Sequence, residues 1–337
     1  MDLRTFWWPV ATATELRADK PLGRVLQGVP IVVFRGHDRK AAILIDRCPH
    51  RHAPLSMGKV CRGEIQCPYH GWKFNSDGLV TSTPGLETIT ARRALIPAIA
   101  SKEEGGLIWA CLAPDESTRK PVLATEVSCE TDSFFLVDIV RSPIDAVAEN
   151  FLDGFHTHFV HSGWIRKEGK RQSVTAEVRQ SPDTVEVRYY GETLQSGIIS
   201  RVLEGDRTES FGRFRLPGTA ELEYRGHKGV NLLVTAWLTP ELSGRTRIHA
   251  RVATRRGMAP GWLKRSILAR LFDVIVQQDK EILEQTHDNI RRFERENGEG
   301  QCPAYLNSEL DLTGPSIRRL LNGESLEESR RSFNVLL

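Results

Sequence analysis

The sequence predicts an α+β protein in two parts: an all-β N-terminal part, and a C-terminal part that combines an antiparallel sheet with two helices. Short β-rich runs separated by turn residues fill the first third of the 337-residue chain. Strand-like segments recur downstream, bracketed by helical patterns at about 144–159 and 262–293. A polar stretch with two prolines, 113–121, separates the parts, so we predict domains over residues 1–115 and 116–337.

The predicted strands are runs of β-branched and aromatic residues bounded by turn signals. In the N-terminal part they are 24–27, 31–35, 41–46 and 106–112. In the C-terminal part they are 174–178, 184–190, 210–216, 220–224, 230–238 and 246–254. Their spacing predicts one antiparallel sheet, but a register error of one residue reverses which side chains face inward.

Composition excludes several classes of protein. The net charge of +3 is small and the basic residues are evenly spread, which argues against a nucleic-acid partner. No apolar run approaches the roughly 20 residues that cross a bilayer, and the N-terminus does not resemble a secretory signal. We therefore expect a soluble, cytoplasmic protein with no membrane partner. Six cysteines do not make a disulfide framework, and we expect four of them to be ordinary buried thiols: Cys61, Cys111, Cys129 and Cys302.

Two short loops carry one Cys and one His each. Cys48 and His50 stand two residues apart, and Cys67 and His70 follow in a second loop. Two thiolates suit one ferric iron, and two imidazoles hold the other and raise the potential of a two-iron, two-sulfide cluster. A structural zinc site is the alternative, but zinc fingers usually group their Cys and their His separately. The order of ligands therefore favours the diiron cluster.

A second group of candidate ligands lies in the first predicted helix. His156, His158 and His161 fall within six residues, and mononuclear non-haem iron takes two imidazoles and one carboxylate on one face. On a regular helix His156 and His161 point about 140° apart, whereas His158 and His161 share a face. If His156 is a ligand, the helix must distort or end between His156 and His161. Spacing alone leaves the pair open.

The last predicted helix offers a carboxylate. Its inward stripe comprises Leu268, Leu271, Phe272, Ile275, Ile282, Leu283, Ile290 and Phe293. Asp279 lies on this stripe, where an unpaired carboxylate is costly. Binding iron removes that cost, and a buried salt bridge to an arginine of the sheet is the alternative.

These segments resemble those of Rieske non-haem iron oxygenases. The loop Cys67-Pro68-Tyr69-His70-Gly71-Trp72 and the pattern Asn150-x-x-Asp153-x-x-His156-x4-His161 are similar to the cluster and iron motifs of that family. The resemblance covers essentially the whole chain and is strongest to the shorter type, such as vanillate and dicamba O-demethylases. It implies a Rieske [2Fe-2S] domain followed by a helix-grip (START-like) domain, assembled as a homotrimer.

The resemblance also implies roles for individual residues. The cluster ligands are Cys48, His50, Cys67 and His70, and the iron ligands are His156, His161 and Asp279. Asp153 is expected to bond His156 and to bridge to His70 of a neighbouring subunit, and Asn150 is a polar neighbour of the site. His158 is then a core residue or supports a ligand. We further expect the substrate pocket to be walled by Phe151, Phe155, Asn231 and Trp237.

The implied activity is monooxygenation: O₂ and a small organic substrate, aromatic or heterocyclic, are converted by hydroxylation or oxidative demethylation. The sequence carries no nicotinamide or flavin fingerprint, so electrons from NAD(P)H must arrive through a separate reductase or ferredoxin. Dihydroxylation or desaturation is an alternative outcome at the same iron. An electron-transfer protein and a ligand-binding module with a vestigial iron site are the alternatives from other classes.

Overall fold

The computed structural model describes residues 2–86, 94–127, 130–167, 169, 171–191, 206–257, 261–298 and 302–337. The chain forms two compact units, one of residues 2–123 with 239–243 and the other of 124–238 with 244–337. Residues 116–123 therefore group with the first unit, whereas the sequence analysis assigned them to the second domain.

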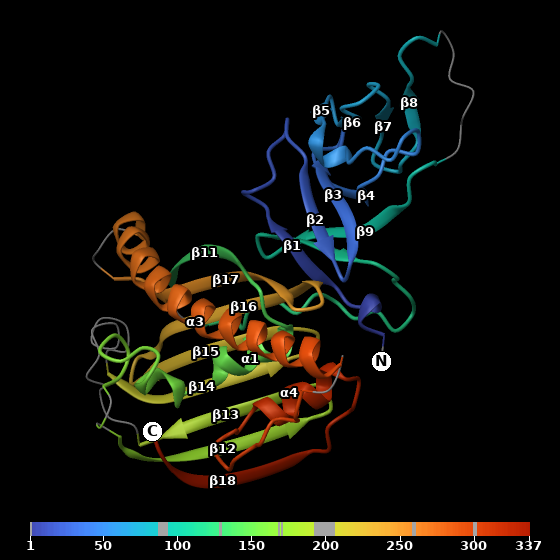
Figure 1. Cartoon of the computed structure of the whole chain (residues 1–337). Coiled ribbons are helices and arrows are strands. Elements are labelled where there is room, and N and C mark those ends of the chain that lie inside the picture. Colours follow the sequence, from blue (N-terminus) through green and yellow to red (C-terminus); the bar gives the residue numbers. More distant parts are fainter. Residues whose placement is uncertain are drawn as a thin grey trace. The chain divides into compact units, whose positions relative to one another are not determined.

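The first unit is all-β, as predicted. Six strands form a sheet in the order β1-β10-β9-β4-β3-β2, and four short strands form a second in the order β5-β6-β7-β8 (Figure 1). The strands are Trp8–Thr12 (β1), Leu22–Leu26 (β2), Val29–Arg35 (β3), Ala41–Ile45 (β4), Lys59–Cys61 (β5), Glu64–Gln66 (β6), Lys73–Phe74 (β7), Val80–Ser82 (β8), Ala98–Glu104 (β9) and Leu107–Cys111 (β10). Two 3₁₀ turns, Leu3–Thr5 and Leu55–Met57, complete it.

A buried apolar core supports the cluster loops of this unit. It includes Phe34, Leu44 and Phe74, and Cys48 and Cys67 belong to it. The prediction for the other cysteines holds for Cys111, which is fully buried, but it is wrong for Cys61 and Cys302, which are half-buried. Cys129 lies outside the described residues.

Gly78 closes a turn against this core, and its replacement should destabilise the first unit. Its φ is +75°, and a Cβ there would lie 2.0 Å from the backbone oxygen of Ile96, which is itself buried. Backbone cannot yield as a flexible side chain does, so we expect Gly78→Ala to cost at least roughly 1–3 kcal/mol. Thermal loss of the cluster's visible absorbance measures the effect.

Gly85→Ala is the matched control for Gly78→Ala. Gly85 also has positive φ, +91°, but a Cβ there meets nothing within 4 Å. The difference between the two variants isolates the steric clash from the backbone strain. Equal melting temperatures for both variants would contradict the prediction.

The second unit is built on an eight-stranded antiparallel sheet, which confirms the predicted architecture. The strand order is β11-β17-β16-β15-β14-β13-β12-β18. The strands are Thr131–Val140 (β11), Ser173–Ser181 (β12), Thr184–Tyr190 (β13), Arg207–Arg215 (β14), Thr219–Gly226 (β15), Gly229–Leu242 (β16), Arg245–Arg255 (β17) and Ser329–Leu336 (β18). β12 to β17 correspond to the six predicted strands, and the two edge strands, β11 and β18, were missed.

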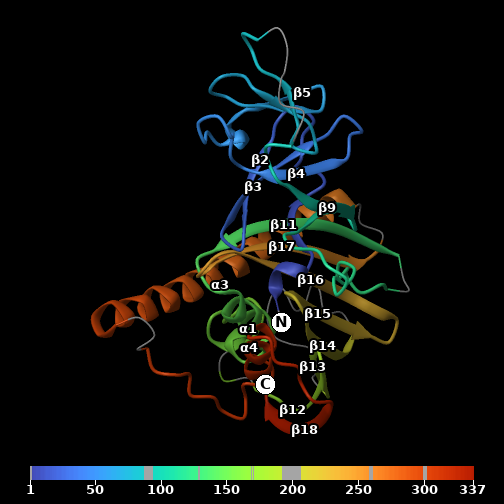
Figure 2. The ribbon, with the colours of Figure 1, turned by 90° about the vertical axis from the view of Figure 1, so that its right-hand side faces the viewer.

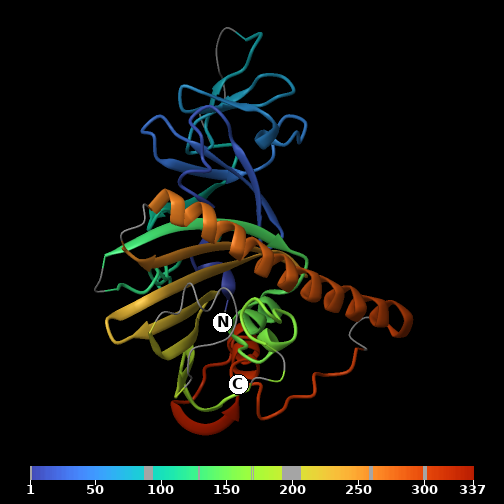
Figure 3. The ribbon, with the colours of Figure 1, turned by 90° about the vertical axis from the view of Figure 1, so that its left-hand side faces the viewer.

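Helices cover one face of this sheet (Figures 1 and 3). They are α1 (Ile144–Leu152), α3 (Gly261–Asn297) and α4 (Gly314–Leu321). α1 packs on β14, β15 and β17, whereas α3 packs on β11. The hydrophobic core between α3 and the sheet includes Leu268 and Ile275 of the helix with Leu232, Val234 and Val252 of the strands.

The predicted inward stripe of α3 holds only along part of the helix. Leu268, Ile275 and Leu283 are buried, but Ile282 and Phe293 are 43% and 47% exposed. Figure 2 shows the reason: the C-terminal half of α3 extends beyond the sheet. Asp279 lies in the part that still faces the sheet.

The two faces of the sheet carry different chemistry. Leu232, Val234 and Ala236 of β16 face α3, and their neighbours face away. On the opposite face, Glu221 and Glu223 are fully buried beneath arginines: Arg215 pairs with Glu221, and Arg213 and Arg225 pair with Glu223. On β15 this alternation places apolar side chains toward the helices and charged side chains on the other side.

Candidate active site

Two tight loops of the first unit bring the predicted cluster residues together. Cys48 begins a loop after β4, and Cys67 begins the turn between β6 and β7. The N–H of Cys48 donates to the carbonyl of Ala53 at 2.9 Å, and the N–H of Cys67 donates to that of Trp72 at 2.8 Å. Each loop is thus closed by its own backbone hydrogen bond, which fixes the start of each Cys-to-His segment.

The donor atoms of these loops suit a [2Fe-2S] cluster. Both thiols are buried, and burial together with the neighbouring Cys67 thiol raises the pKa of Cys48. The rings of His50 and His70 lie 4.5 Å apart between centroids, and His50 stacks on Trp72. Nδ1 of His50 is buried, and no described residue of the chain forms a hydrogen bond with it. Two adjoining thiols and two adjoining imidazoles, one with an unsatisfied nitrogen, fit the donor set of a Rieske cluster.

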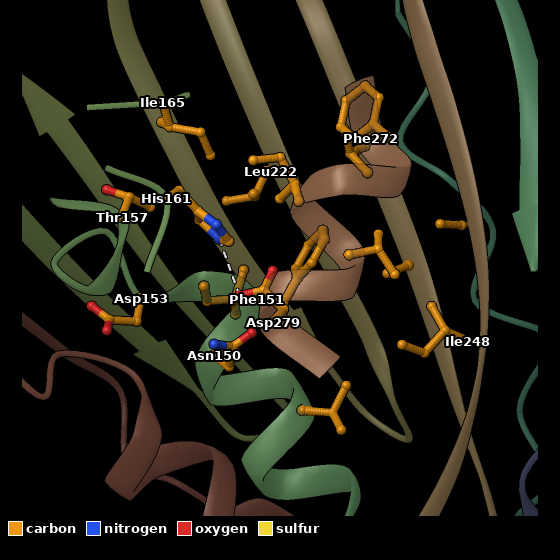
Figure 4. A pocket seen from close by; sticks show the side chains of 18 of the residues that line it. Asn150, Phe151, Asp153, Thr157, His161, Ile165, Leu222, Ile248, Phe272 and Asp279 are labelled. Carbon is orange, nitrogen blue, oxygen red and sulfur yellow. Dashed lines mark ion pairs between the residues drawn. The ribbon is translucent and has the colours of Figure 1, made fainter. Parts of the chain in front are cut away.

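Three side chains converge at a second point, in the second unit. Nε2 of His156 lies 3.3 Å from Oδ1 of Asp279, and Nε2 of His161 lies 3.0 Å from the same oxygen. The two Nε2 atoms are 3.2 Å apart. Among the residues that the structure describes, this is the single group of three or more His, Cys, Asp or Glu whose donor atoms all lie within 4.8 Å. Figure 4 shows Asp279 on α3 facing His161.

This donor set fits a divalent metal ion. Asp279 Oδ1 is buried and makes no hydrogen bond with good geometry in the described chain, although both Nε2 atoms lie beside it. Burial lowers the pKa of His156, but the carboxylates of Asp153 and Asp279 outweigh it and raise the pKa to about 9. The site therefore favours positive charge. Two imidazoles and one carboxylate are the protein ligands of mononuclear non-haem iron.

An early end to α1 makes this convergence possible. The helix ends at Leu152, not near Phe159, and Asp153 adopts an extended conformation (φ −75°, ψ 119°). Oδ1 and Oδ2 of Asp153 accept the N–H groups of Phe155 (2.7 Å) and His156 (3.2 Å), which starts a 3₁₀ turn at His156–His158. α1 thus ends before both histidines, and the 3₁₀ turn that contains His156 ends before His161, so regular helical spacing does not apply to the pair.

Asp153 also lies beside the side chain of His156. Its Oδ2 is 3.5 Å from Nδ1 of His156, which is long for a hydrogen bond but close enough for an ion pair. The Asp153 side chain is 34% exposed. One carboxylate thus shapes the turn, attracts the ring of His156 and remains accessible from outside this unit.

An apolar cavity of about 270 Å³ opens onto the three side chains. Figure 4 shows Asn150 and Phe151 of α1, Phe272 of α3, and Leu222 and Ile248 of the sheet around it. Pockets of roughly 300–1,000 Å³ that are mostly apolar and hold a few convergent polar groups are typical of small-molecule sites. The arrangement suits a small organic molecule placed beside a metal ion.

Comparison with known proteins identifies the architecture. A model of the Rieske [2Fe-2S] domain matches residues 6–95, and a model of the vanillate O-demethylase oxygenase C-terminal domain matches residues 140–324, more than half of the chain. The chain belongs to the Rieske oxygenase family. Members of this family hold a [2Fe-2S] cluster in the first domain and a mononuclear iron in the second, which agrees with both donor sets.

Curated relatives of this Rieske oxygenase include several of known activity. The chain is 30% identical over 158 residues to the oxygenase component of dicamba O-demethylase from Stenotrophomonas maltophilia, with 46% of each chain covered. It is 34% identical over 176 residues to methylxanthine N1-demethylase NdmA from Pseudomonas putida, with 48% of each covered. Chlorophyllide a oxygenase from Arabidopsis thaliana is 32% identical over 170 residues, with 49% of this chain and 30% of the relative covered. The matches thus span less than half the length of these relatives.

Solved structures show the same fold. Dicamba monooxygenase bound to dicamba superposes with a TM-score of 0.78 at 21% identity, covering 95% of this chain and 97% of that one. Pseudomonas putida NdmA with caffeine gives a TM-score of 0.73 at 22% identity, covering 95% and 90%. In the described part of this Rieske oxygenase, no helix is long and apolar enough to cross a membrane.

The structure places the other predicted residues with mixed results. Asn150 and Phe151 line the cavity, but Phe155, Asn231 and Trp237 do not. The Asn231 amide bonds Asp206 at 3.2 Å, and Trp237 lies near Phe135 instead. Asn231 and Trp237 are odd-numbered residues of β16, whereas its even-numbered residues face the cavity. The predicted orientation of this strand was therefore wrong by one residue.

Two further expectations concern His158 and Asp279. His158 is buried away from the donor group, with Nδ1 3.2 Å from the carbonyl oxygen of Lys167, so it belongs to the core. Asp279 forms ion pairs with His156 and His161, so the alternative of an arginine partner finds no support in the described residues.

Sequence reasoning missed Gln278. Its Oε1 lies 2.9 Å from Nδ1 of His161. An amide oxygen only accepts, so Nδ1 of His161 donates to Gln278, and Nε2 is the ring nitrogen on the Asp279 side. The available signal was position: Gln278 follows Ile275 by three residues and therefore lies on the inward side of α3.

Proposed function

We propose that this protein is the terminal oxygenase component of a Rieske non-haem iron monooxygenase system. It uses O₂ and electrons relayed from NAD(P)H to hydroxylate or oxidatively demethylate a small organic substrate, aromatic or heterocyclic. The observation that carries the proposal is the convergence of His156, His161 and Asp279 at one side of an apolar cavity. Relatives that act on dicamba and on methylxanthines support the demethylase class.

The chain's own groups divide the work. When bound, the cluster supplies single electrons and the iron supplies O₂ activation. In our assignment Cys48, His50, Cys67 and His70 hold the cluster. His156, His161 and Asp279 would hold the iron. Phe151 and the apolar strand residues exclude bulk water, while the Asn150 amide orients the substrate beside the metal ligands.

One measurement tests the proposal first. Anaerobically reduced protein should give a Rieske electron paramagnetic resonance signal with about three irons and two sulfides per chain. Formaldehyde release and O₂ uptake then report turnover with methoxy or N-methyl compounds. Zinc without sulfide would overturn both metal assignments. A Rieske signal with two irons per chain, unchanged after ferrous reconstitution, would show that the protein is an electron carrier and not an oxygenase.

Electron delivery requires partners. A separate reductase or ferredoxin passes electrons to the cluster. In a homotrimer, Asp153 then connects His70 of a neighbouring copy to the iron site, and the electrons follow this path. Exposure supports both ends of this path, because His70 is exposed and Asp153 is partly so. Sedimentation equilibrium should give the mass of three chains, and a monomer would contradict the path.

Asp153→Asn should separate electron delivery from cluster assembly. The amide keeps an acceptor for the turn but loses the charge beside His156, so NADH-driven product formation should fall about 10–100-fold. Cluster content, read from the visible spectrum, should not change. Unaltered turnover at full iron occupancy would exclude the role given to Asp153.

Gln278→Leu should weaken iron binding at the second site. Without the amide oxygen, nothing fixes the Nδ1–H tautomer of His161, and affinity should fall about 10–100-fold. Iron retained during dialysis against a chelator measures this, and the Rieske signal should persist. Gln277→Leu, at the exposed neighbouring position, is the control and should retain iron. Equal retention by both variants would show that Gln278 has no such role.

A further inference from the structure

Apolar side chains from the sheet and from both α1 and α3 make up most of the cavity wall. Leu222, Val234 and Ile248 come from three strands, Phe272 from α3 and Phe151 from α1. Bringing a charged group against such a wall removes it from water without giving it a partner. A charged substrate therefore depends on compensation from a few specific side chains.

The cations at the cavity are already engaged. Apart from the two candidate ligand histidines, the basic residues among the described lining are Arg166 and Lys280. Lys280 Nζ donates to Oδ1 of Asp138 at 2.9 Å, and Arg166 Nη1 donates to the carbonyl of Gly154 and to Oγ1 of Thr157 at 2.9 Å. Both cations therefore already have acceptors, and an anionic substrate gains less from them than it would from an unpaired cation.

Carboxylates outnumber cations around the same space. The described lining contains four: Asp138, Asp153, Asp273 and Asp279. Against two cations they leave a formal charge of −2, which ferrous iron brings to zero. With the metal bound and both histidines neutral, the cavity therefore offers no net attraction for an anion.

The polar groups that remain suit a neutral ligand. The Asn150 side chain lies close to Asp279 in Figure 4, and within the described chain its amide has no hydrogen-bond partner. Ser210 also lines the cavity. An amide and hydroxyls bond carbonyl, ether, amide or hydroxyl groups without a change of charge.

We infer that the substrate is an uncharged, largely apolar organic molecule with one or two neutral polar groups, and that the cavity rejects carboxylates. This inference rests on the proposed function and deepens it. The specificity element is the Asp138–Lys280 ion pair. The Asp138 carboxylate neutralises the lysine that would otherwise attract an anionic substrate.

Matched pairs of ligands test the inference. Iron-loaded, anaerobic protein is titrated calorimetrically with a panel of methoxyarenes of one and two rings, each offered as the carboxamide and as the carboxylate. We expect the best carboxamide to bind at least about ten-fold tighter than its carboxylate. A carboxylate that binds equally or more tightly overturns the inference, as does a panel in which no neutral member binds.

Variants of the ion pair locate the cause. Asp138→Asn frees Lys280, so carboxylate affinity should rise at least about ten-fold. Asp273→Asn is the matched control, because it removes one cavity carboxylate without freeing a cation, and its effect should be smaller. If Lys280 already binds anions in the wild type, Lys280→Gln abolishes carboxylate binding instead, which overturns the inference.

Binding and turnover fail separately in this design. Tight binding of a carboxamide without iron-dependent O₂ uptake or formaldehyde would refute the oxygenase function but preserve the charge selectivity. Turnover of a carboxylate in preference to its carboxamide would preserve the function and refute the selectivity.

Discussion

Asp279→Ala is expected to empty the mononuclear iron site and abolish product formation while leaving the cluster intact. Asp279 supplies the carboxylate of the group, with Oδ1 within 3.3 Å of both imidazole Nε2 atoms. Removal of a group that merely orients a ligand costs roughly 10–100-fold in metal affinity, so loss of the ligand itself should cost at least about 100-fold. Iron per chain should fall from about three to about two, with sulfide unchanged.

Asp273→Ala provides the control for this variant. Asp273 lies on the same helix and at the margin of the same cavity, but it is exposed and outside the donor group. It should retain full iron and measurable turnover. Asp279→Ala protein that keeps three irons and forms product would remove Asp279 from the ligand set.

Cys67→Ser is expected to abolish the Rieske cluster and, with it, all turnover driven by NAD(P)H. Iron–sulfur clusters are held by thiolates, and serine oxygen is a poor substitute for them; the two buried thiols also adjoin each other. Sulfide should fall to about zero and iron to about one per chain. The first unit should also lose thermal stability, because Cys67 belongs to its core and the cluster ties its two loops together.

Cys61→Ser tests whether the loss is specific to the ligand. Cys61 lies on β5 in the same small sheet, where its Sγ is 3.5 Å from Oε1 of Gln66. Its replacement should leave the visible and electron paramagnetic resonance spectra unchanged. A Rieske spectrum that survives Cys67→Ser would disprove the cluster assignment.

Both candidate metal sites could be predicted because their donors lie in short segments or on a regular pattern. Each Cys-to-His loop is one short continuous segment, so its candidate ligands can be recognised without knowing how the strands pair. Asp279 was found because a charge on an apolar helical stripe is conspicuous, and α3 keeps that stripe up to the point where it passes the sheet. The iron pair depended on the resemblance to a family, because α1 was expected to continue through His156.

The remaining features depended on partners distant in the sequence. Asp153 accepts two backbone N–H groups and so ends the helix, an interaction that helical periodicity does not reveal. Asn231 and Trp237 were assigned to the cavity although the register of β16 turns them to the opposite face. Gln278 gains its importance only from a ring 117 residues earlier in the chain.

Three consecutive residues of α3 make three different connections. Gln278 bonds His161, Asp279 joins the donor group, and Lys280 pairs with Asp138 of β11. A single turn of helix is therefore held to the His segment and to the edge of the sheet at the same time. With iron in place, metal binding and the docking of this helix form one thermodynamically linked equilibrium, so each stabilises the other. The charge selectivity of the cavity belongs to the same equilibrium, because Lys280 keeps its partner only while the helix is docked.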